Sequence, residues 1–207
     1  MATIEALVAI DEDFNSKTLV SGYYRTYFIM LHENRIYVSY ETSGSPLRIN
    51  VYGLTGQPIS EWVGKDNGNF SRPAIVSNQI VVPDTRNQQL TVYSLSGETL
   101  RYISNFQLTG DIGRSSSICT ADKNCIIVST MVSSQISKIN ITTGEAVWTS
   151  NDIVNPQAVA IYGKNYVCVG SERKISFLNV NTGLIFYFSN VFKFKLISCM
   201  FSIFLRI

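Results

Sequence analysis

Residues 79–103, QIVVPDTRNQQLTVYSLSGETLRYI, carry the clearest pattern in the sequence. Ile80 to Val82 form a short run rich in β-branched residues and bounded by turn formers, which is typical of a buried strand. Residues 90–95 alternate loosely between apolar and polar positions, as a half-covered strand does. Gly97 then supplies a tight turn, because glycine tolerates a positive φ. Together with residues 73–76 upstream, the stretch predicts four consecutive strands.

The same order of strands recurs in three other segments, which are residues 36–63, 126–149 and 166–188. Each has a glycine turn before its last strand, so the turn glycines are separated by 41, 47 and 39 residues; they are Gly56, Gly97, Gly144 and Gly183. A drifting period of about 40 to 50 residues with four strands per repeat indicates propeller blades. The sequence therefore predicts an all-β protein, a β-propeller of about four recognisable four-stranded blades. A sandwich or a simple meander is the alternative.

Residues 70–97 resemble an NHL repeat. Phe70-Ser-Arg-Pro73 precedes the first strand and Asp84-Thr-Arg-Asn87 follows the second, as in that family, and the match is best in residues 70–103. Blade 1 departs from the pattern, because Tyr40-Glu41-Thr42 stands where the Asp-Thr would be. Residues 143–148 and 169–183 instead resemble quinoprotein-like repeats.

The NHL propellers of tripartite-motif ubiquitin ligases recruit target proteins. The resemblance therefore implies a substrate-recruiting module. Ligase activity itself is not expected, because the sequence has no RING or B-box pattern of cysteines.

The repeats divide the chain into three parts. Residues 1–22 are an N-terminal segment that could supply a closing strand, and residues 23–188 are expected to form the blades, at about 23–63, 70–103, 116–150 and 156–188. Residues 189–207 form an apolar tail without Gly, Pro or Asp. We expect this tail to lie outside a truncated or incomplete propeller, with the first strands of a fifth blade as the alternative. Its longest charge-free run has ten residues, whereas a membrane span needs about 20.

Composition and charge exclude several classes of function. The chain has 207 residues and a formal net charge of +2, which predicts no strong attraction to nucleic acid or to an anionic membrane. Residues 1–14 do not resemble a signal peptide, so we expect a cytoplasmic protein with reduced cysteines. Cys119 and Cys125 could face each other across a hairpin, and a disulfide between them is the less favoured alternative.

Few residues are candidates for chemistry. His32 is the only histidine and falls in a predicted hairpin turn, which favours a solvated residue over a metal ligand or a general base. Residues 64–68, GKDNG, faintly resemble a calcium loop but lack further carboxylates, and they are predicted to form a turn. Asp84 is expected to accept backbone N–H bonds that fix its own loop. Trp62 and Trp148 are expected to pack between blades.

A propeller binds partners through loops at one end, which we expect at residues 41–46, 64–72, 84–88, 104–115, 131–134, 151–155 and 171–174. The cations of these loops are Lys65, Arg72, Arg86, Arg114, Arg173 and Lys174. The anions are Glu41, Asp66, Asp84, Asp111, Asp152 and Glu172. Because the two signs balance, the face suits a polar protein–protein interface better than RNA. The expected partner-binding residues are Lys65, Arg72, Arg86, Arg114 and Arg173.

The sequence therefore predicts a non-catalytic repeat module, a scaffold that binds an unidentified protein without metal or cofactor. Nucleic acid and a transmembrane span are not expected, and an open propeller edge would allow self-association. The competing interpretation is a fragment of a small-molecule-binding, hydrolytic or quinoprotein-like propeller enzyme with its ligand on the central axis. The expected innermost strands, at 74–76, 118–120 and 158–160, offer almost no polar side chains for that role. A non-functional truncated gene product is a third alternative.

Overall fold

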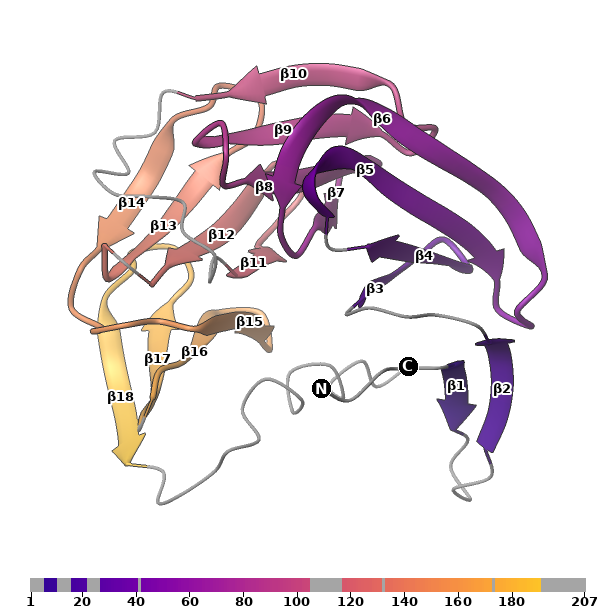
Figure 1. Ribbon diagram of the computed structural model, residues 1–207. Helices are drawn as coiled ribbons and strands as arrows, with labels where there is room; N and C mark the ends of the chain where they lie inside the picture. Colours follow the sequence, from indigo (N-terminus) through magenta and orange to yellow (C-terminus); the bar gives the residue numbers. More distant parts are fainter. Residues whose placement is uncertain are drawn as a thin grey trace.

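The computed structural model describes residues 6–10, 16–21, 27–40, 42–104, 117–131, 133–172 and 174–190. In these residues every regular element is a β-strand. Figure 1 shows the strands arranged as blades along an arc that does not close into a ring. The predicted all-β, propeller-like fold is therefore confirmed, and the ring is open.

Four blades follow one another along the chain. Blade 1 comprises β3 (Tyr27–His32), β4 (Arg35–Tyr40), β5 (Thr42–Gly53) and β6 (Pro58–Phe70). Blade 2 comprises β7 (Ala74–Val76), β8 (Gln79–Asp84), β9 (Gln89–Ser94) and β10 (Thr99–Ile103). Blade 3 comprises β11 (Ser117–Thr120), β12 (Cys125–Thr130), β13 (Gln135–Asn140) and β14 (Ala146–Ser150). Blade 4 comprises β15 (Ala158–Tyr162), β16 (Tyr166–Gly170), β17 (Lys174–Asn179) and β18 (Ile185–Asn190).

The first strand of each blade lies on the inner side of the arc, and the fourth lies on the outer side (Figure 1). The expected inner strands at 74–76, 118–120 and 158–160 therefore correspond to β7, β11 and β15. β1 (Ala6–Ile10) pairs with β2 (Ser16–Ser21) in a two-stranded sheet. In the described part of the chain, β2 is the strand that pairs with β1. The closing strand expected from residues 1–22 stays a prediction. Residues 191–207, the greater part of the predicted tail, lie outside the described residues.

Two predicted loops of blade 1 are strands, which corrects the sequence interpretation. β5 begins at Thr42 and β6 continues to Phe70, so most of both predicted loops, 41–46 and 64–72, lies within strands. Two bulges in this long hairpin accommodate Gly44 and residues 64–66, and Phe70 pairs with Asp84 of β8. Residues 64–68 are thus not a turn. Their glycines instead allow close contact, because a Cβ at Gly68 would lie 2.8 Å from an Asp84 carboxylate oxygen.

Three apolar clusters fill the spaces between neighbouring blades. Between blades 1 and 2, the buried Tyr37, Leu47 and Ile49 pack with Ile80 and Tyr93. The cluster between blades 2 and 3 includes Val81, Leu90, Val92, Ile126, Val128 and Ile139. The cluster between blades 3 and 4 includes Ile127, Ile136, Val159, Val167, Val169 and Leu178. Each blade is therefore held chiefly by burial of apolar area against its neighbours.

The four turn glycines all adopt a positive φ, as the repeat predicted. The φ values are 87° at Gly56, 90° at Gly97, 77° at Gly144 and 72° at Gly183. In this left-handed region an L side chain is strained, which explains why glycine recurs at the turn before each fourth strand. A neighbouring blade also approaches Gly144 closely, because an added Cβ would lie 3.0 Å from a methyl carbon of Ile103 in blade 2.

The two tryptophans lie between blades, as predicted, and each covers a turn glycine of the following blade. An added Cβ at Gly97 would lie 2.4 Å from the ring of Trp62, which belongs to blade 1. An added Cβ at Gly183 would lie 2.6 Å from the ring of Trp148, which belongs to blade 3. The indole N–H of Trp148 also donates to the Val180 carbonyl at 3.0 Å. Only glycine leaves room for an indole at these two turns, so the tryptophans fasten consecutive blades together.

Candidate functional site

The loop after β8 is fixed by a buried carboxylate. Asp84 is fully buried, and its Oδ1 accepts hydrogen bonds from the backbone N–H groups of Asn69, Arg86 and Asn87 at 3.1 to 3.2 Å. Its Oδ2 accepts from the Asn87 side-chain amide at 2.6 Å. Asp84 therefore clamps residues 84–87 onto the end of β6, as the sequence predicted. Because its oxygens are already occupied, this acid is unavailable to a ligand.

The predicted partner-binding residues fall in different surroundings. Arg86 lies in the clamped loop and is exposed, whereas Lys65 is exposed on β6 rather than in a loop. Arg72 lies in the short segment between β6 and β7 and is partly buried. Burial lowers the pKa of its guanidinium, and the nearby Cys119 thiol acts in the opposite direction. Arg114 and Arg173 lie outside the described residues.

The acidic residues of the predicted loop face are less available than their number implies. Asp66 lies on β6 and accepts a hydrogen bond from the Tyr102 hydroxyl at 2.6 Å, which raises the pKa of Tyr102. Asp152 accepts from the Ser150 hydroxyl at 3.1 Å. Glu172 is exposed. Glu41 and Asp111 lie outside the described residues. Near β6 and β8 the acidic residues are therefore hydrogen-bonded within the protein, while their charges still act on neighbouring groups such as Tyr93.

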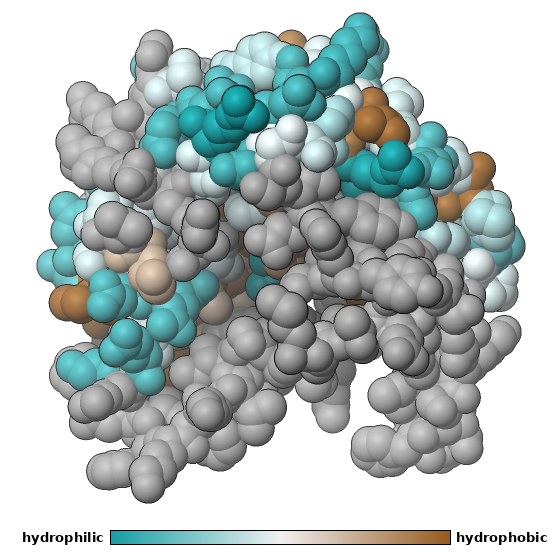
Figure 2. Space-filling model, viewed as in Figure 1, coloured by the Kyte–Doolittle hydropathy of each residue, from teal (hydrophilic) through white to brown (hydrophobic). Residues whose placement is uncertain are grey.

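The surface over β6, β9 and β10 is mostly hydrophilic, with isolated hydrophobic residues between the polar ones (Figure 2). On β6, the polar residues Lys65 and Asn67 are exposed. Such a surface is typical of a polar interface rather than of an apolar docking groove.

A groove of about 640 Å³ lies beside the connection between blades 3 and 4. It is lined by Asp152, Ile153, Val154, Asn155, Ser171, Glu172, Lys174, Ser176, Leu184 and Ile185. No residue of the inner strands β3, β7, β11 or β15 lines it. The groove is therefore displaced from the central axis, where the enzyme interpretation placed its ligand.

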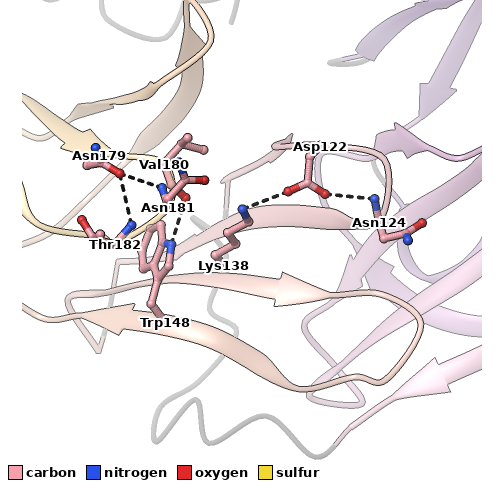
Figure 3. Close-up of polar contacts among 8 residues, drawn as sticks. All are labelled: Asp122, Asn124, Lys138, Trp148, Asn179, Val180, Asn181 and Thr182. Atoms are coloured by element: carbon pink, nitrogen blue, oxygen red, sulfur yellow. Dashed lines mark hydrogen bonds and ion pairs between the residues drawn. The ribbon is translucent and has the colours of Figure 1, made fainter.

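A polar frame supports the junction of blades 3 and 4 (Figure 3). Lys138 of β13 is buried, and its ammonium forms an ion pair of 2.9 Å with Asp122, whose side chain is 47% exposed. The Asn124 backbone N–H donates to the same carboxylate at 3.0 Å. Burial alone would raise the pKa of Asp122, but these hydrogen bonds and the charge of Lys138 hold it below its usual value. The arrangement compensates a buried cation and serves the fold.

The turns before β14 and β18 are built in the same way. Asn140 Oδ1 accepts from the backbone N–H groups of Thr142 and Thr143, at 2.8 and 3.3 Å. Asn179 Oδ1 accepts from those of Asn181 and Thr182, at 2.9 and 3.2 Å (Figure 3). This device was not predicted, although an Asn stands four residues before both Gly144 and Gly183 in the sequence.

The remaining candidates for chemistry have structural surroundings. His32 is the last residue of β3 and therefore lies at the predicted hairpin turn. Its ring Nε2 lies 2.8 Å from Asn78 Oδ1 of blade 2. Cys119, Cys125 and Cys168 are free thiols in the described region, and β11 pairs Cys119 with Ile127 rather than with Cys125. Burial raises the pKa of Cys119 to about 12 and that of Cys168 to about 11, which keeps both thiols protonated.

The described part of the chain holds no candidate metal site and no helix that could span a membrane. No group of three or more His, Cys, Asp or Glu residues there could hold a metal ion. None of the residues described there forms a helix of the length and apolarity that crossing a membrane requires.

The blade 4 face that points away from blade 3 is aromatic. Strand alternation places Val167 and Leu178 toward blade 3 and their neighbours Tyr166 and Phe177 on the opposite face. Phe186 contacts both of these rings, with centroids 4.4 and 6.0 Å away, and is 55% exposed. In the described residues no further blade covers this face, so it is the exposed end of the arc at which the sequence predicts possible self-association.

Comparison with known proteins supports the architecture alone. No model of a protein family matches the chain, and no curated protein is similar to it in sequence. The structure is similar to a WD40 β-propeller chain in the crystal structure of the mitotic checkpoint complex, with a TM-score of 0.65 and 9% sequence identity. The similarity covers 90% of this chain and 58% of that chain. This protein thus spans little more than half the length of that propeller chain and shares its fold.

Proposed function

We propose that this chain is a non-catalytic β-propeller module that binds a protein partner through the end of the arc that carries the loop at 84–88. The observation that carries the proposal is this loop itself. Asp84 holds it through four hydrogen bonds while Arg86 stays exposed at its tip. A loop fixed in advance loses little conformational entropy on binding, which favours recognition of another molecule.

Two further observations support the proposal. One solved structure that resembles this chain belongs to a complex of proteins, the mitotic checkpoint complex. The resemblance of residues 70–103 to an NHL repeat covers the same loop, which favours the narrower role of recruiting a target. The competing enzyme role has less support, because the groove at Asp152 and Glu172 lies away from the inner strands.

The test is to find which end of the arc binds peptides. The full chain would be used to select ligands from a random peptide library, and hydrogen exchange would locate the ligands on the protein. We expect protection at the loop end, at residues 84–88 and 131–134. Arg86→Glu should weaken the selected ligands, whereas Lys164→Glu should not, because Lys164 is exposed in the turn between β15 and β16 at the opposite end. Protection confined to the turns at the opposite end, or failure to select any ligand, would contradict the proposal.

A further inference from the structure

The groove beside the connection between blades 3 and 4 contains two strongly exposed apolar side chains. Val154 and Leu184 both line it, and they are 71% and 67% exposed. In the described part of the chain, no other large hydrophobic residue is more exposed than these two. Single exposed apolar residues are ordinary on a protein surface, whereas two that line the same concave site favour a binding surface.

Other residues that line the groove are buried. Ile153 is 5% exposed and belongs to the apolar cluster between blades 3 and 4, and Ile185 packs against the same cluster. Ser171 and Ser176 also line the groove and are buried. The groove therefore reaches from the surface to the edge of the core. Its volume of about 640 Å³ lies within the range of about 300–1,000 Å³ that is typical of ligand sites.

Hydrogen bonds hold the two backbone segments that border the groove. The Asn155 N–H donates to the Ser134 hydroxyl oxygen at 3.1 Å, which ties the connection between the blades to blade 3. The Ser171 N–H donates to the Lys174 carbonyl at 2.9 Å, which closes the turn between β16 and β17. A groove whose borders are fixed in advance loses little conformational entropy when a ligand enters it.

The described residues that line the groove carry more negative than positive charge. Asp152 and Glu172 are exposed acids, and among these residues Lys174 is the basic one. Asp152 accepts a hydrogen bond from the Ser150 hydroxyl at 3.1 Å, and this neutral donor leaves the charge of the carboxylate in place. Neither acid takes part in an ion pair within the described residues. A cationic group on the ligand therefore complements the groove.

We propose that this groove binds a short segment of a protein that carries a lysine or an arginine beside apolar side chains. The cation of the segment meets the carboxylates of Asp152 and Glu172, and its apolar side chains cover Val154 and Leu184. The inference goes beyond the proposed function, because it concerns blades 3 and 4 and does not involve the loop at 84–88.

An uncharged apolar small molecule is the other occupant to consider. It would cover Val154 and Leu184, but its binding would not depend on the two carboxylates. A segment with both kinds of side chain uses the apolar and the acidic parts of the lining together, so the observations favour the peptide. The dependence of binding on charge distinguishes the two occupants.

The test measures the binding of fluorescently labelled peptides to the full chain by anisotropy. Each peptide consists of Gly and Ser with one Arg and two Leu, and the set varies the distance from the Arg to the Leu pair from about one to six positions. We expect the best peptide to bind about fivefold more tightly than its counterpart with Gln in place of Arg, and about tenfold more tightly than the one with Ser in place of both Leu. Added salt should weaken the contribution of the Arg alone, because salt screens charges.

Substitutions in the protein locate the site. Glu172→Gln and Asp152→Asn should each weaken the best peptide about threefold, and Leu184→Ser should weaken it about fivefold. Glu172→Gln should leave the binding of the Gln peptide unchanged, because that peptide has no cation to lose a partner.

Blade 2 supplies matched controls. Glu98 and Leu100 are exposed there and do not line the groove, so Glu98→Gln and Leu100→Ser should each leave binding within about twofold of the unmodified chain. Circular dichroism of every variant reports whether the chain still folds. Equal binding of the Arg and Gln peptides, equal binding of the Leu and Ser peptides, or equal effects of the groove and control substitutions would overturn the inference.

The inference and the proposed function fail separately. Arg86→Glu alters the loop at 84–88 and should leave the groove peptides unaffected. If library ligands protect that loop but no peptide depends on Glu172 and Leu184, the inference about the groove is wrong and the loop-end module stands. If the peptides depend on Glu172 and Leu184 while no ligand depends on Arg86, the groove stands and the placement of the partner at 84–88 is wrong.

Discussion

Gly183→Ala should destabilise the protein far more than an ordinary glycine substitution, because it displaces Trp148. Gly183 has a φ of +72°, and an added Cβ would lie 2.6 Å from Cε3 and 2.7 Å from Cδ2 of the indole. Carbon atoms do not approach so closely, so the ring must move away from the turn. Its hydrogen bond to the Val180 carbonyl, 3.0 Å long, would then be lost.

The expected cost is the sum of three terms. The left-handed backbone costs an alanine about 1–2 kcal/mol. Loss of the indole hydrogen bond costs about 1 kcal/mol. Exposure of part of the ring, on the order of 40 Å² at about 25 cal/mol per Å², adds about 1 kcal/mol. The substitution should therefore lower the free energy of unfolding by about 3–4 kcal/mol, which lowers Tm by about 10 °C for a chain of this size.

Gly163 supplies a matched control. It has a φ of +62° in the turn between β15 and β16, and no atom lies within 4 Å of an added Cβ. Gly163→Ala should therefore cost only the backbone term of about 1–2 kcal/mol. Urea unfolding followed by circular dichroism measures both variants under identical conditions. In a Trp148→Leu background the extra cost of Gly183→Ala should disappear, because the substituted ring no longer competes for the space.

The reasoning is refuted if Gly183→Ala and Gly163→Ala destabilise the protein equally. It is also refuted if the Trp148→Leu background leaves their difference unchanged, because the difference would then not come from the indole.

Four other substitutions and one deletion test the fold and its association. Asp84→Asn should cost about 2–3 kcal/mol, because a buried carboxylate loses charge-assisted bonds, and an unchanged urea midpoint would contradict the clamp. Asp122→Asn should cost less than the about 3–5 kcal/mol of a fully buried pair, since Asp122 is 47% exposed. Folding lowers the pKa of Asp122, so the stability that its carboxylate contributes is present above pH about 4 and is lost as the pH falls through the folded-state pKa. Asp122→Asn and the unmodified chain should therefore converge in stability at acid pH. Lys138→Met should flatten the dependence of stability on pH in this range. Phe186→Ser should reduce any concentration-dependent association seen by light scattering. Removal of residues 191–207 should leave the circular dichroism spectrum of the blades intact, whereas loss of folding would assign the tail to the propeller.

The repeat was predictable because its signal is local. A turn that requires a left-handed φ selects glycine directly, so Gly56, Gly97, Gly144 and Gly183 mark the blades in the sequence itself. Strands β7 to β18 follow from this spacing and from the short apolar runs between the turns. The hydrogen bonds of Asp84 to its own loop were also predictable, because its partners Arg86 and Asn87 are close to it in the chain.

The extended hairpin of blade 1 was not predictable from local pattern. Residues 64–68 contain two glycines and an asparagine, which locally favour a turn. They remain in β6 because residues 67–70 pair with β5 and Phe70 also bridges to Asp84 of β8, which continues the strand to the next blade. Tertiary pairing thus overrides a turn preference, as it often overrides β propensity.

The surface charge could not be predicted by counting residues. Asp66 is engaged by Tyr102, which lies 36 positions away in the sequence, and nothing local reveals that contact. A count treats such an acid as free, whereas the structure engages it with the exposed Tyr102. The partial burial of Arg72 is hidden in the same way, because it depends on neighbouring blades.

The contact between an outer-strand side chain and the glycine turn of the next blade has a direction along the chain. Trp62 precedes Gly97, Ile103 precedes Gly144, and each covering side chain belongs to the earlier blade. A ribosome makes the chain in that same direction, so the covering side chain is always synthesised before the turn that it covers. Each newly synthesised blade therefore meets a neighbour that already contains the side chain that will cover its glycine turn. Assembly can then proceed blade by blade during translation without waiting for the ring to close.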